Sequence, residues 1–296
     1  MKKFMLAALA LAALAVSAGA LRAQEPSGPP KVLVIDREMV KFGQDAGHEK
    51  NEIAFARAYA SLKRTDHYLA LTSLSGPDRA FFISPYDSFA QWEEAAKQDD
   101  VGRSRALLGP LEEKDGDYVS DGRQIVLTYN EKWSYRAAVD IGQMRYFEME
   151  QFKLRPGHRA DWEALVALFK SAAEKVNLDE HDAFFEVAYG AADGTVLVIT
   201  PRKSLAEVDA AMGTQKTFQD ALGPDGRKKW AELEAAAVKR GKTDLLRFNP
   251  EMSYPTDAWV ASDPAFWKPK PAAKPAAKPA AKPAAKAGSK PAEEKK

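Results

Sequence analysis

The sequence contains no cysteine. This absence excludes disulfide bonds, thiolate catalysis and a lipid-modified cysteine anchor. The short patterns that mark nucleotide-binding proteins, zinc proteases, serine hydrolases and EF-hand proteins are absent as well, which argues against nucleotide binding, zinc-protease activity and serine-hydrolase activity. Histidine is scarce, with four residues in 296, so any imidazole chemistry must come from this small set.

The N-terminal segment 1–23 is typical of a secretory signal peptide. Lys2 and Lys3 precede an apolar run from Phe4 to Ala18, and small residues follow. This run is too short for a membrane-spanning helix, and a retained N-terminal anchor is the alternative interpretation. We therefore expect a periplasmic or secreted protein, in which residues 24–30, rich in Pro, Gly and Ser, form a linker.

The charge is distributed unevenly along the chain. Residues 268–296 carry nine Lys and two Glu (+7) and residues 1–23 carry three cations (+3), so residues 24–267 have a net charge of +1 − 7 − 3 = −9. An acidic body argues against nucleic-acid binding by the folded part, which would need a basic face. The Pro-Ala-Ala-Lys repeats of residues 268–296 predict a disordered, extended tail. This tail is either a solubilising spacer or a contact for an anionic component of the cell envelope.

One short pattern occurs twice, with identical internal spacing and no insertion or deletion. Its members are Glu38, Met39, Phe42, Gly47 and His48 in the first copy, and Glu148, Met149, Phe152, Gly157 and His158 in the second. A repeat decides the whole fold, because each copy is one structural unit. We therefore predict two tandem modules, residues 31–137 and residues 138–267.

Both modules show the same alternation of patterns. Runs of β-branched and aromatic residues predict strands, and apolar residues at helical spacing predict helices. The first module has predicted strands at residues 32–42, 67–74, 79–84 and 124–129, and helices at residues 48–64 and after Pro85. The second has strands at residues 144–153, 181–189 and 195–200 and a last strand, and helices at residues 158–176, after Pro201 and at residues 228–240. The helix at residues 228–240 stands where the first module has a predicted polar loop, Glu112 to Arg123.

A module in this order forms a four-stranded antiparallel sheet with both helices on one face. Its other face needs a cover, which a second module on the same chain supplies. The Gly-His pair after the first strand and the order of the elements resemble the dimeric α+β barrel superfamily, over about residues 31–255. This superfamily includes antibiotic-biosynthesis-type monooxygenases and NIPSNAP-like domains. The resemblance implies an α+β fold, in which two ferredoxin-like modules form a pseudo-dimeric barrel. Its members include cofactor-free oxygenases, haem proteins and proteins without demonstrated chemistry, so it implies no catalytic residue.

The four histidines fall in the repeat as two pairs, His48 with His158 and His67 with His181. His48 begins a helix and His67 lies beyond its end, roughly 24 Å away at about 1.5 Å per residue, so one module cannot join its own two histidines at one metal. We therefore predict no metal site. His48 and His158 cap or pack their helices, or else bind a ligand. His67 and His181 are structural residues or proton-transfer groups.

The repeated carboxylates Glu38 and Glu148 are candidates for acid–base chemistry. Strand alternation places Phe147 and Met149 on one face of their strand and Glu148 and Glu150 on the other. If the helices cover the Phe147 face, the glutamates point between the two sheets, where burial would raise their pKa and suit them to proton transfer. The alternative is an edge position, at which each carboxylate is hydrated or paired with an arginine.

Three functions follow from these patterns. The first is an exported protein that binds a small apolar or amphipathic molecule in a cavity between two antiparallel sheets, without catalysis. The second is a cofactor-independent, oxygenase-like enzyme of the dimeric α+β barrel type, which needs the repeated acidic and imidazole groups to meet in one pocket. The third is an envelope interaction protein that acts through residues 268–296. The predicted ligand-binding residues are Glu38, Glu148, Glu150, His67 and His181, with no catalytic residue assigned, no cofactor, and no transmembrane segment in the mature chain.

Overall fold

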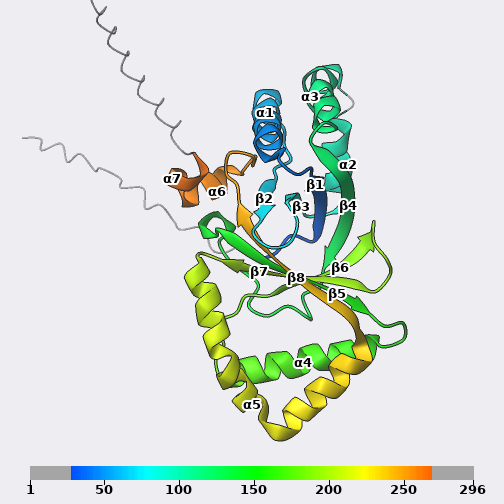
Figure 1. The fold of residues 1–296 in the computed structure, drawn as a ribbon, viewed down its shortest axis with the longest axis vertical. Helices are drawn as coiled ribbons and strands as arrows, with labels where there is room; N and C mark the ends of the chain where they lie inside the picture. Colours follow the sequence, from blue (N-terminus) through cyan, green and yellow to red (C-terminus); the bar gives the residue numbers. More distant parts are fainter. Residues whose placement is uncertain (1–27, 100, 269–296) are drawn as a thin grey trace, which may run out of the picture.

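The computed structural model describes residues 28–99 and 101–268. The predicted signal peptide and, except for Lys268, the predicted tail lie outside these residues. Eight antiparallel strands form a closed barrel in the order β1-β3-β2-β8-β5-β7-β6-β4, with helices packed on its outside (Figure 1). This architecture confirms the predicted α+β class and the predicted barrel. Among the described residues, no helix is both long and apolar enough to cross a membrane.

The first half of the chain contributes four strands and three helices. These are β1 (Val32–Val40), α1 (Asp45–Leu62), β2 (Leu69–Ser73), β3 (Arg79–Tyr86), α2 (Phe89–Lys97), α3 (Gly102–Asp115) and β4 (Val119–Tyr129). The predicted loop from Glu112 to Arg123 is wrong, because α3 occupies its beginning and β4 its end. The sequence did not predict α3, because the helix contains Gly109 and Pro110, which disfavour helices, and because only Ser104 and Leu108 are buried, so it has no apolar periodicity.

The second half contributes the other four strands. Its elements are the 3-10 helix η1 (Ile141–Gln143), β5 (Tyr146–Leu154), α4 (Arg159–Lys175), β6 (Ala183–Tyr189), β7 (Thr195–Arg202), α5 (Leu205–Ala237), β8 (Val238–Phe248), α6 (Asp257–Ser262) and α7 (Pro264–Trp267). The predicted helix at residues 228–240 lies in the second arm of α5 as far as Ala237, and its last three residues belong instead to β8. The helix α5 bends at Gly223, where φ is +68°. Figure 1 shows α5 as two arms that meet at an angle beside α4.

Two prolines mark strands rather than helix starts. Pro85 pairs with Leu33 in β3, and Pro201 pairs with Phe147 in β7. The prediction that each proline opens a helix is therefore wrong by four residues, since α2 and α5 begin at Phe89 and Leu205. Each proline lies in the last two residues of its strand, where one missing N–H is tolerated.

Two strand pairings close the ring. Leu71 of β2 pairs with Phe248 of β8, and Leu127 of β4 pairs with Val187 of β6. A four-stranded sheet from either half alone would leave two exposed edges, which attract other strands. In the closed ring every strand has two neighbours.

Alternate residues of each strand point into the barrel. Through most of the barrel the inner side chains are apolar and almost fully buried, and they include Leu33, Ile35, Leu71, Phe81, Leu127, Phe147, Met149, Phe185, Leu197 and Leu246. The intervening residues face the helices and form separate apolar clusters. Burial on both faces explains why runs such as Val32 to Ile35 are continuously apolar.

The last two helices close one end of the barrel. Trp267 of α7 is 4% exposed and joins the inner apolar cluster. Its ring lies against those of Phe248, Trp259 and Phe266, and its indole N–H donates to the Gly142 carbonyl oxygen over 2.8 Å. The side chain therefore links α6, α7 and η1 to the core.

We predict that Trp267→Ala lowers the free energy of unfolding by about 3–5 kcal/mol, because it leaves a large cavity in the inner apolar cluster. Urea unfolding followed by fluorescence and by circular dichroism measures the change. Phe42, which is 98% exposed, gives the matched aromatic control, and Phe42→Ala should change stability by less than about 0.5 kcal/mol. A loss below about 1 kcal/mol for Trp267→Ala would show that the closed end contributes little to the core.

Candidate functional site

The repeated carboxylates Glu38 and Glu148 lie on the outer, helix-covered face of the barrel. Phe147 and Met149 belong to the inner cluster, so their neighbour Glu148 points outward by strand alternation. The predicted shared face of Glu148 and Glu150 is correct, but the prediction that these glutamates point between the sheets is wrong. Alternation shows which residues share a face; it does not show which face the helices cover.

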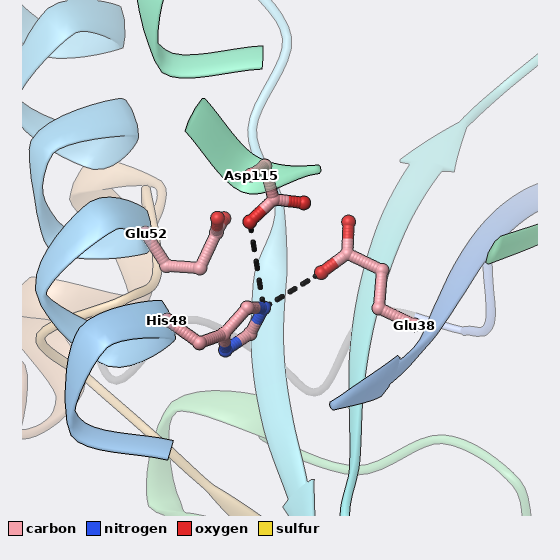
Figure 2. A group of neighbouring side chains, drawn as sticks. All are labelled: Glu38, His48, Glu52 and Asp115. Atoms are coloured by element: carbon pink, nitrogen blue, oxygen red, sulfur yellow. Dashed lines mark hydrogen bonds and ion pairs between the residues drawn. The ribbon is translucent and has the colours of Figure 1, made fainter. Parts of the chain in front are cut away.

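Glu38 belongs to a compact cluster of four side chains (Figure 2). The acid–base cluster comprises Glu38 of β1, His48 and Glu52 of α1, and Asp115 at the end of α3. One potential ligand atom from each residue lies within 4.8 Å of the other three. The Nε2 atom of His48 lies 2.8 Å from Oε2 of Glu38 and 4.0 Å from Oδ1 of Asp115. Three carboxylates thus surround one imidazole.

The helix α1 positions two members of this cluster by its period. His48 and Glu52 are four residues apart and therefore share one face of the helix. The neighbouring Asn51 ties this face to α3, because its side-chain amide donates to the Leu111 carbonyl oxygen over 3.1 Å and to Oδ1 of Asp115 over 3.4 Å. This amide bridge holds the two helices together at the cluster.

Gly47 lets the start of α1 pack closely against the chain that follows α3. A Cβ atom at this position would lie 2.6 Å from the ring of Tyr118, which is closer than non-bonded carbon atoms approach. The glycine of the repeated Gly-His pair therefore has a packing role in this half. It keeps His48 near Asp115, three residues before the tyrosine.

Burial makes the acid–base cluster electrostatically unusual. Glu52 is 5% exposed, and its Oε1 atom has no hydrogen-bond partner. Burial raises the pKa of Glu52 to about 9, and the charges of Glu38 and Asp115 contribute to this rise. Burial and the charge of Glu38 also raise the pKa of Asp115. The cluster therefore contains three carboxyl groups and no arginine or lysine.

A pocket of about 360 Å³ adjoins the acid–base cluster. Its polar wall includes the carboxylates of Glu38, Glu52 and Asp115. Aromatic rings form much of the remaining wall, from Phe55, Tyr59, Tyr68 and Phe82. The pocket can therefore hold an apolar or aromatic group next to the carboxylates.

The donor set of the cluster suits one divalent cation. Neighbouring ligand atoms bonded to a metal at about 2.0–2.2 Å lie about 3–3.6 Å from one another, so the four groups would have to move closer together around a cation. Carboxylates favour Mg²⁺ and Mn²⁺, while an imidazole favours Zn²⁺, Fe²⁺ and similar ions. We predicted no metal site because we considered His48 only together with His67. The structure instead brings His48 to Glu38.

The second half carries a different acidic group on its outer face. Arg202 contacts Glu148 over 2.6 Å and Glu180 over 2.8 Å. Glu148 is therefore paired with an arginine, as the alternative interpretation of the sequence predicted. Burial raises the pKa of Glu180 to about 7 and, together with the charges of Glu148 and Glu180, raises that of Glu150. These residues line a cavity of about 750 Å³ between the sheet and the helices α4 and α5.

The predicted site residues do not meet in one pocket. Glu38 lines the pocket of the first half, whereas Glu148 and Glu150 line that of the second. His67 stacks on the Tyr254 ring, with 4.7 Å between the ring centroids. His181 places Nδ1 2.6 Å from the carbonyl oxygen of Arg136. Neither histidine reaches a carboxylate of the predicted set, and their ligand-binding role stays a prediction.

Sequence reasoning missed His48 as a partner of Glu38, and it missed Glu52 and Asp115 altogether. One signal was present, because Glu38 and His48 are the first and last residues of the repeated pattern. Glu52 follows His48 by one helical turn, and this spacing is a common arrangement of two ligands. Asp115 had no signal, since α3 was not predicted.

No protein-family model matches the sequence, and no curated protein matches it. Solved structures do resemble it. A monooxygenase-like protein of Fusobacterium nucleatum is 6% identical, with 74% of this chain and 93% of that chain covered and a TM-score of 0.49. An anthrone oxidase-like protein is 12% identical, with coverages of 77% and 93% and a TM-score of 0.49. A mutant chlorite dismutase of Candidatus Nitrospira defluvii is 12% identical, with coverages of 75% and 93% and a TM-score of 0.46. The similarity concerns the fold alone and assigns no role to any residue of this chain.

The prediction of a binding protein without catalysis is wrong. The similar structures carry the names of monooxygenases, an anthrone oxidase-like protein and chlorite dismutases, and one carries the name of a haem-binding protein. Buried side chains such as Leu71, Leu127 and Leu246 fill the barrel centre, and the cavity on the inner face lies at one end of the barrel, where cationic side chains line it. The carboxyl groups and the imidazole of the acid–base cluster lie on the outer face of the sheet.

Asp182 of the second half gives a testable dependence of stability on pH. Burial raises the pKa of Asp182 from 3.8 to about 6, although the Thr200 hydroxyl donates to this carboxyl over 2.6 Å. The folded protein therefore holds a proton that the unfolded chain loses between about pH 4 and pH 6, so this group lowers stability as pH rises through that window. Above the window the loss is complete.

We predict that Asp182→Asn, compared with the unmodified protein, gains on the order of 1–3 kcal/mol of unfolding free energy between pH 4.5 and pH 7.5. Urea unfolding at several pH values measures this gain. The exposed Asp209 of α5 provides the control, since Asp209→Asn should show a constant difference across the same range. A difference for Asp182→Asn that does not vary with pH would contradict the argument.

Proposed function

We propose that this protein is an enzyme that acts on a small molecule with the help of a divalent cation bound by Glu38, His48, Glu52 and Asp115. One observation carries the proposal. Three carboxylates and an imidazole converge from β1, α1 and α3, while the buried Oε1 atom of Glu52 has no hydrogen-bond partner. Buried carboxylates that are not paired with a cation cost considerable free energy. A bound divalent cation would supply the missing charge.

Structural roles do not account for the cluster as well. Buried acidic groups that stabilise a fold are paired with Arg or Lys, as Glu148 is with Arg202. Among the described residues, Glu38 has an ion pair only with His48. The cluster also borders the 360 Å³ pocket, so a cation there would be accessible to a substrate.

The geometry of the site suggests a role for the cation and for each group of residues. A divalent cation supplies a Lewis acid that polarises a bound oxygen or lowers the pKa of a bound water. With a cation bound, Nε2 of His48 and the carboxylate of Glu38 would be its ligands, and the hydrogen bond between them would be replaced by bonds to the cation. The rings of Tyr59, Tyr68 and Phe82 offer an apolar surface to the substrate. We therefore propose a substrate that joins an aromatic or apolar group to an oxygen-bearing group.

A second candidate is a metal-free enzyme of the cofactor-independent oxygenase type in the same pocket. The 2.8 Å contact between His48 Nε2 and Glu38 Oε2 favours it, because a carboxylate that orients an imidazole makes it a better base. Its substrate would be an aromatic molecule with an acidic hydroxyl group. This class corresponds to the predicted second function, with His48 in place of His67 and His181.

We also propose that residues 31–137 and 138–267 are tandem ferredoxin-like modules of an exported chain. The pattern that begins at Glu38 and returns unchanged in spacing at Glu148 supports this. The strand order supports it too, because the first half reads β4-β1-β3-β2 around the ring and the second half reads β8-β5-β7-β6. Each order has the second and third strands of its half at one side and the fourth strand at the other.

We predict that chelator-treated full-length protein binds Mn²⁺ or Zn²⁺ at one site per chain. Because Glu52 and His48 would be direct ligands, Glu52→Gln and His48→Asn should each raise the Kd at least about tenfold, which equals about 1.4 kcal/mol. Isothermal titration calorimetry and metal-dependent thermal shift measure the effect. Saturating metal should stabilise the unmodified protein by mass action.

The control is Glu113→Gln, which removes an exposed carboxylate of α3 two residues before Asp115 and should leave the Kd unchanged. Equal metal affinity in Glu52→Gln, His48→Asn and the unmodified protein would reject the metal site. If no metal binds, but turnover of a hydroxylated aromatic compound depends on His48, the metal-free candidate is correct.

A further inference from the structure

The open end of the barrel is lined by cationic side chains. It lies on the inner face of the sheet, so the wall of the barrel separates it from the acid–base cluster. We define the basic mouth by its seven cationic residues, Arg37, Arg79, Arg123, Lys153, Lys239, Arg240 and Lys242. These residues come from the strands β1, β3, β4, β5 and β8. The other end of the barrel is closed by α6 and α7, so the basic mouth is its only open end among the described residues.

The register of the strands places like charges side by side in the basic mouth. Arg37 of β1 pairs with Arg123 of β4, and Lys153 of β5 pairs with Arg240 of β8. Like charges at directly paired positions destabilise a sheet. Two such pairs on the inner face of one barrel therefore cost stability. A local cost of this kind is typical of residues kept for binding.

The carboxylates near the basic mouth do not balance its charge. Asp121 contacts both Arg37 and Arg123, and Asp244 contacts both Arg79 and Lys242. Seven cations thus share two carboxylates, which leaves a surplus of five positive charges. The surplus is notable because residues 24–267 as a whole carry a net charge of −9.

Several cationic groups are free to bind an anion. Among the described residues, neither Lys239 nor Arg240 has a side-chain hydrogen bond or ion pair. The Nε atom of Arg37 is buried and has no hydrogen-bond partner. An unpaired buried guanidinium N–H is costly unless an acceptor is supplied. By contrast, both terminal nitrogens of Arg79 already donate hydrogen bonds to Asp244, over 3.0 and 2.6 Å.

The cavity inside the basic mouth has the size of a ligand site. Its volume is about 570 Å³, within the range of small-molecule pockets. Its floor is apolar, formed by Ile35, Phe81, Ile125, Met149 and Leu197. Because a charged group is unfavourable next to apolar side chains, a charged ligand would keep its anionic groups at the outer part of the cavity, next to the arginines.

We propose that the basic mouth binds a small, multiply charged anion, with two or more phosphate or carboxylate groups held by Arg37, Arg123 and Arg240. Guanidinium groups bind both kinds of group through two parallel hydrogen bonds. A single negative charge would leave most of the surplus uncompensated, whereas three or four charges on one molecule would match it. Binding of such an anion also removes the repulsion within the Arg37/Arg123 and Lys153/Arg240 pairs.

The experiment compares two variants of the full-length protein. Arg37→Gln/Arg240→Gln removes two cations from the basic mouth, and Arg247→Gln removes one exposed cation from the same strand, β8. Both variants retain residues 268–296 with their nine lysines, so any binding of anions to that segment is common to all samples. Isothermal titration calorimetry is performed with sodium tripolyphosphate, citrate and acetate as the probes.

We expect tripolyphosphate or citrate to bind the unmodified protein at one site per chain, and acetate to bind at least about a hundredfold more weakly. The Arg37→Gln/Arg240→Gln variant should lose affinity at least tenfold, and Arg247→Gln should keep it. Higher salt should weaken binding, because the contacts are electrostatic. A preference between the two polyvalent probes identifies phosphate or carboxylate as the natural group.

Stability without any anion separates binding from folding. The Arg37→Gln/Arg240→Gln variant should melt at the same temperature as the unmodified protein or higher, because it relieves like-charge repulsion. Affinity for tripolyphosphate and citrate that is equal in this variant and in the unmodified protein would overturn the proposal. Affinity for acetate equal to that for the polyvalent probes would overturn it as well.

Discussion

Closure of the eight-stranded ring is the constraint from which the other features follow. The pairings of β2 with β8 and of β4 with β6 join the two halves. Once the ring is closed, every strand has one face in the barrel and one toward the helices, and strand alternation assigns each residue to a face. A register shift of one residue would exchange the faces and bury charged groups in the core. The closed ring therefore fixes the position of every polar side chain in the strands.

The strand β1 illustrates this assignment. Its first four residues, Val32 to Ile35, are apolar and pack on both faces of the sheet. In its second part, Arg37 faces the basic mouth and Glu38 faces α1 and α3. The apolar part of the strand thus holds the register, and the polar part presents two neighbouring residues to two different sites. Any shift of β1 would move both sites together.

Much of the fold was predictable because it depends on local patterns. The strands from Val32 and from Thr195, and the helices over α1 and α4, follow from alternating and helical periodicity. The face of Glu38 was not predictable, since one chain's alternation does not reveal which side the helices cover. The site was harder still. Asp115 reaches it from α3, a helix whose Gly109 and Pro110 conceal it, and His48 reaches Glu38 through tertiary packing that depends on Gly47 and Tyr118.

The two halves use corresponding positions differently, and this difference explains why the acid–base cluster occurs in the first half. In the second half, Arg202 neutralises Glu148, and His158 turns to Asp161, with Nδ1 2.8 Å from Oδ2. In the alignment that matches His48 with His158, the counterpart of Glu52 is Trp162, which packs in an apolar cluster. The sequence Ile-Ser-Pro before Tyr86 matches Ile-Thr-Pro before Arg202, so a neutral tyrosine stands where the second half has its arginine.

Because β3 has a tyrosine where β7 has Arg202, the ion-pair partner of Glu38 is His48. The helix α1 then adds Glu52 at the position where α4 has the indole ring of Trp162. The first half thereby gathers three carboxyl groups around one imidazole. At the same two positions the second half has Arg202, which forms an ion pair with Glu148, and Trp162, which packs in an apolar cluster. Two positions on a shared framework are thus enough to separate a packed face from an acidic one.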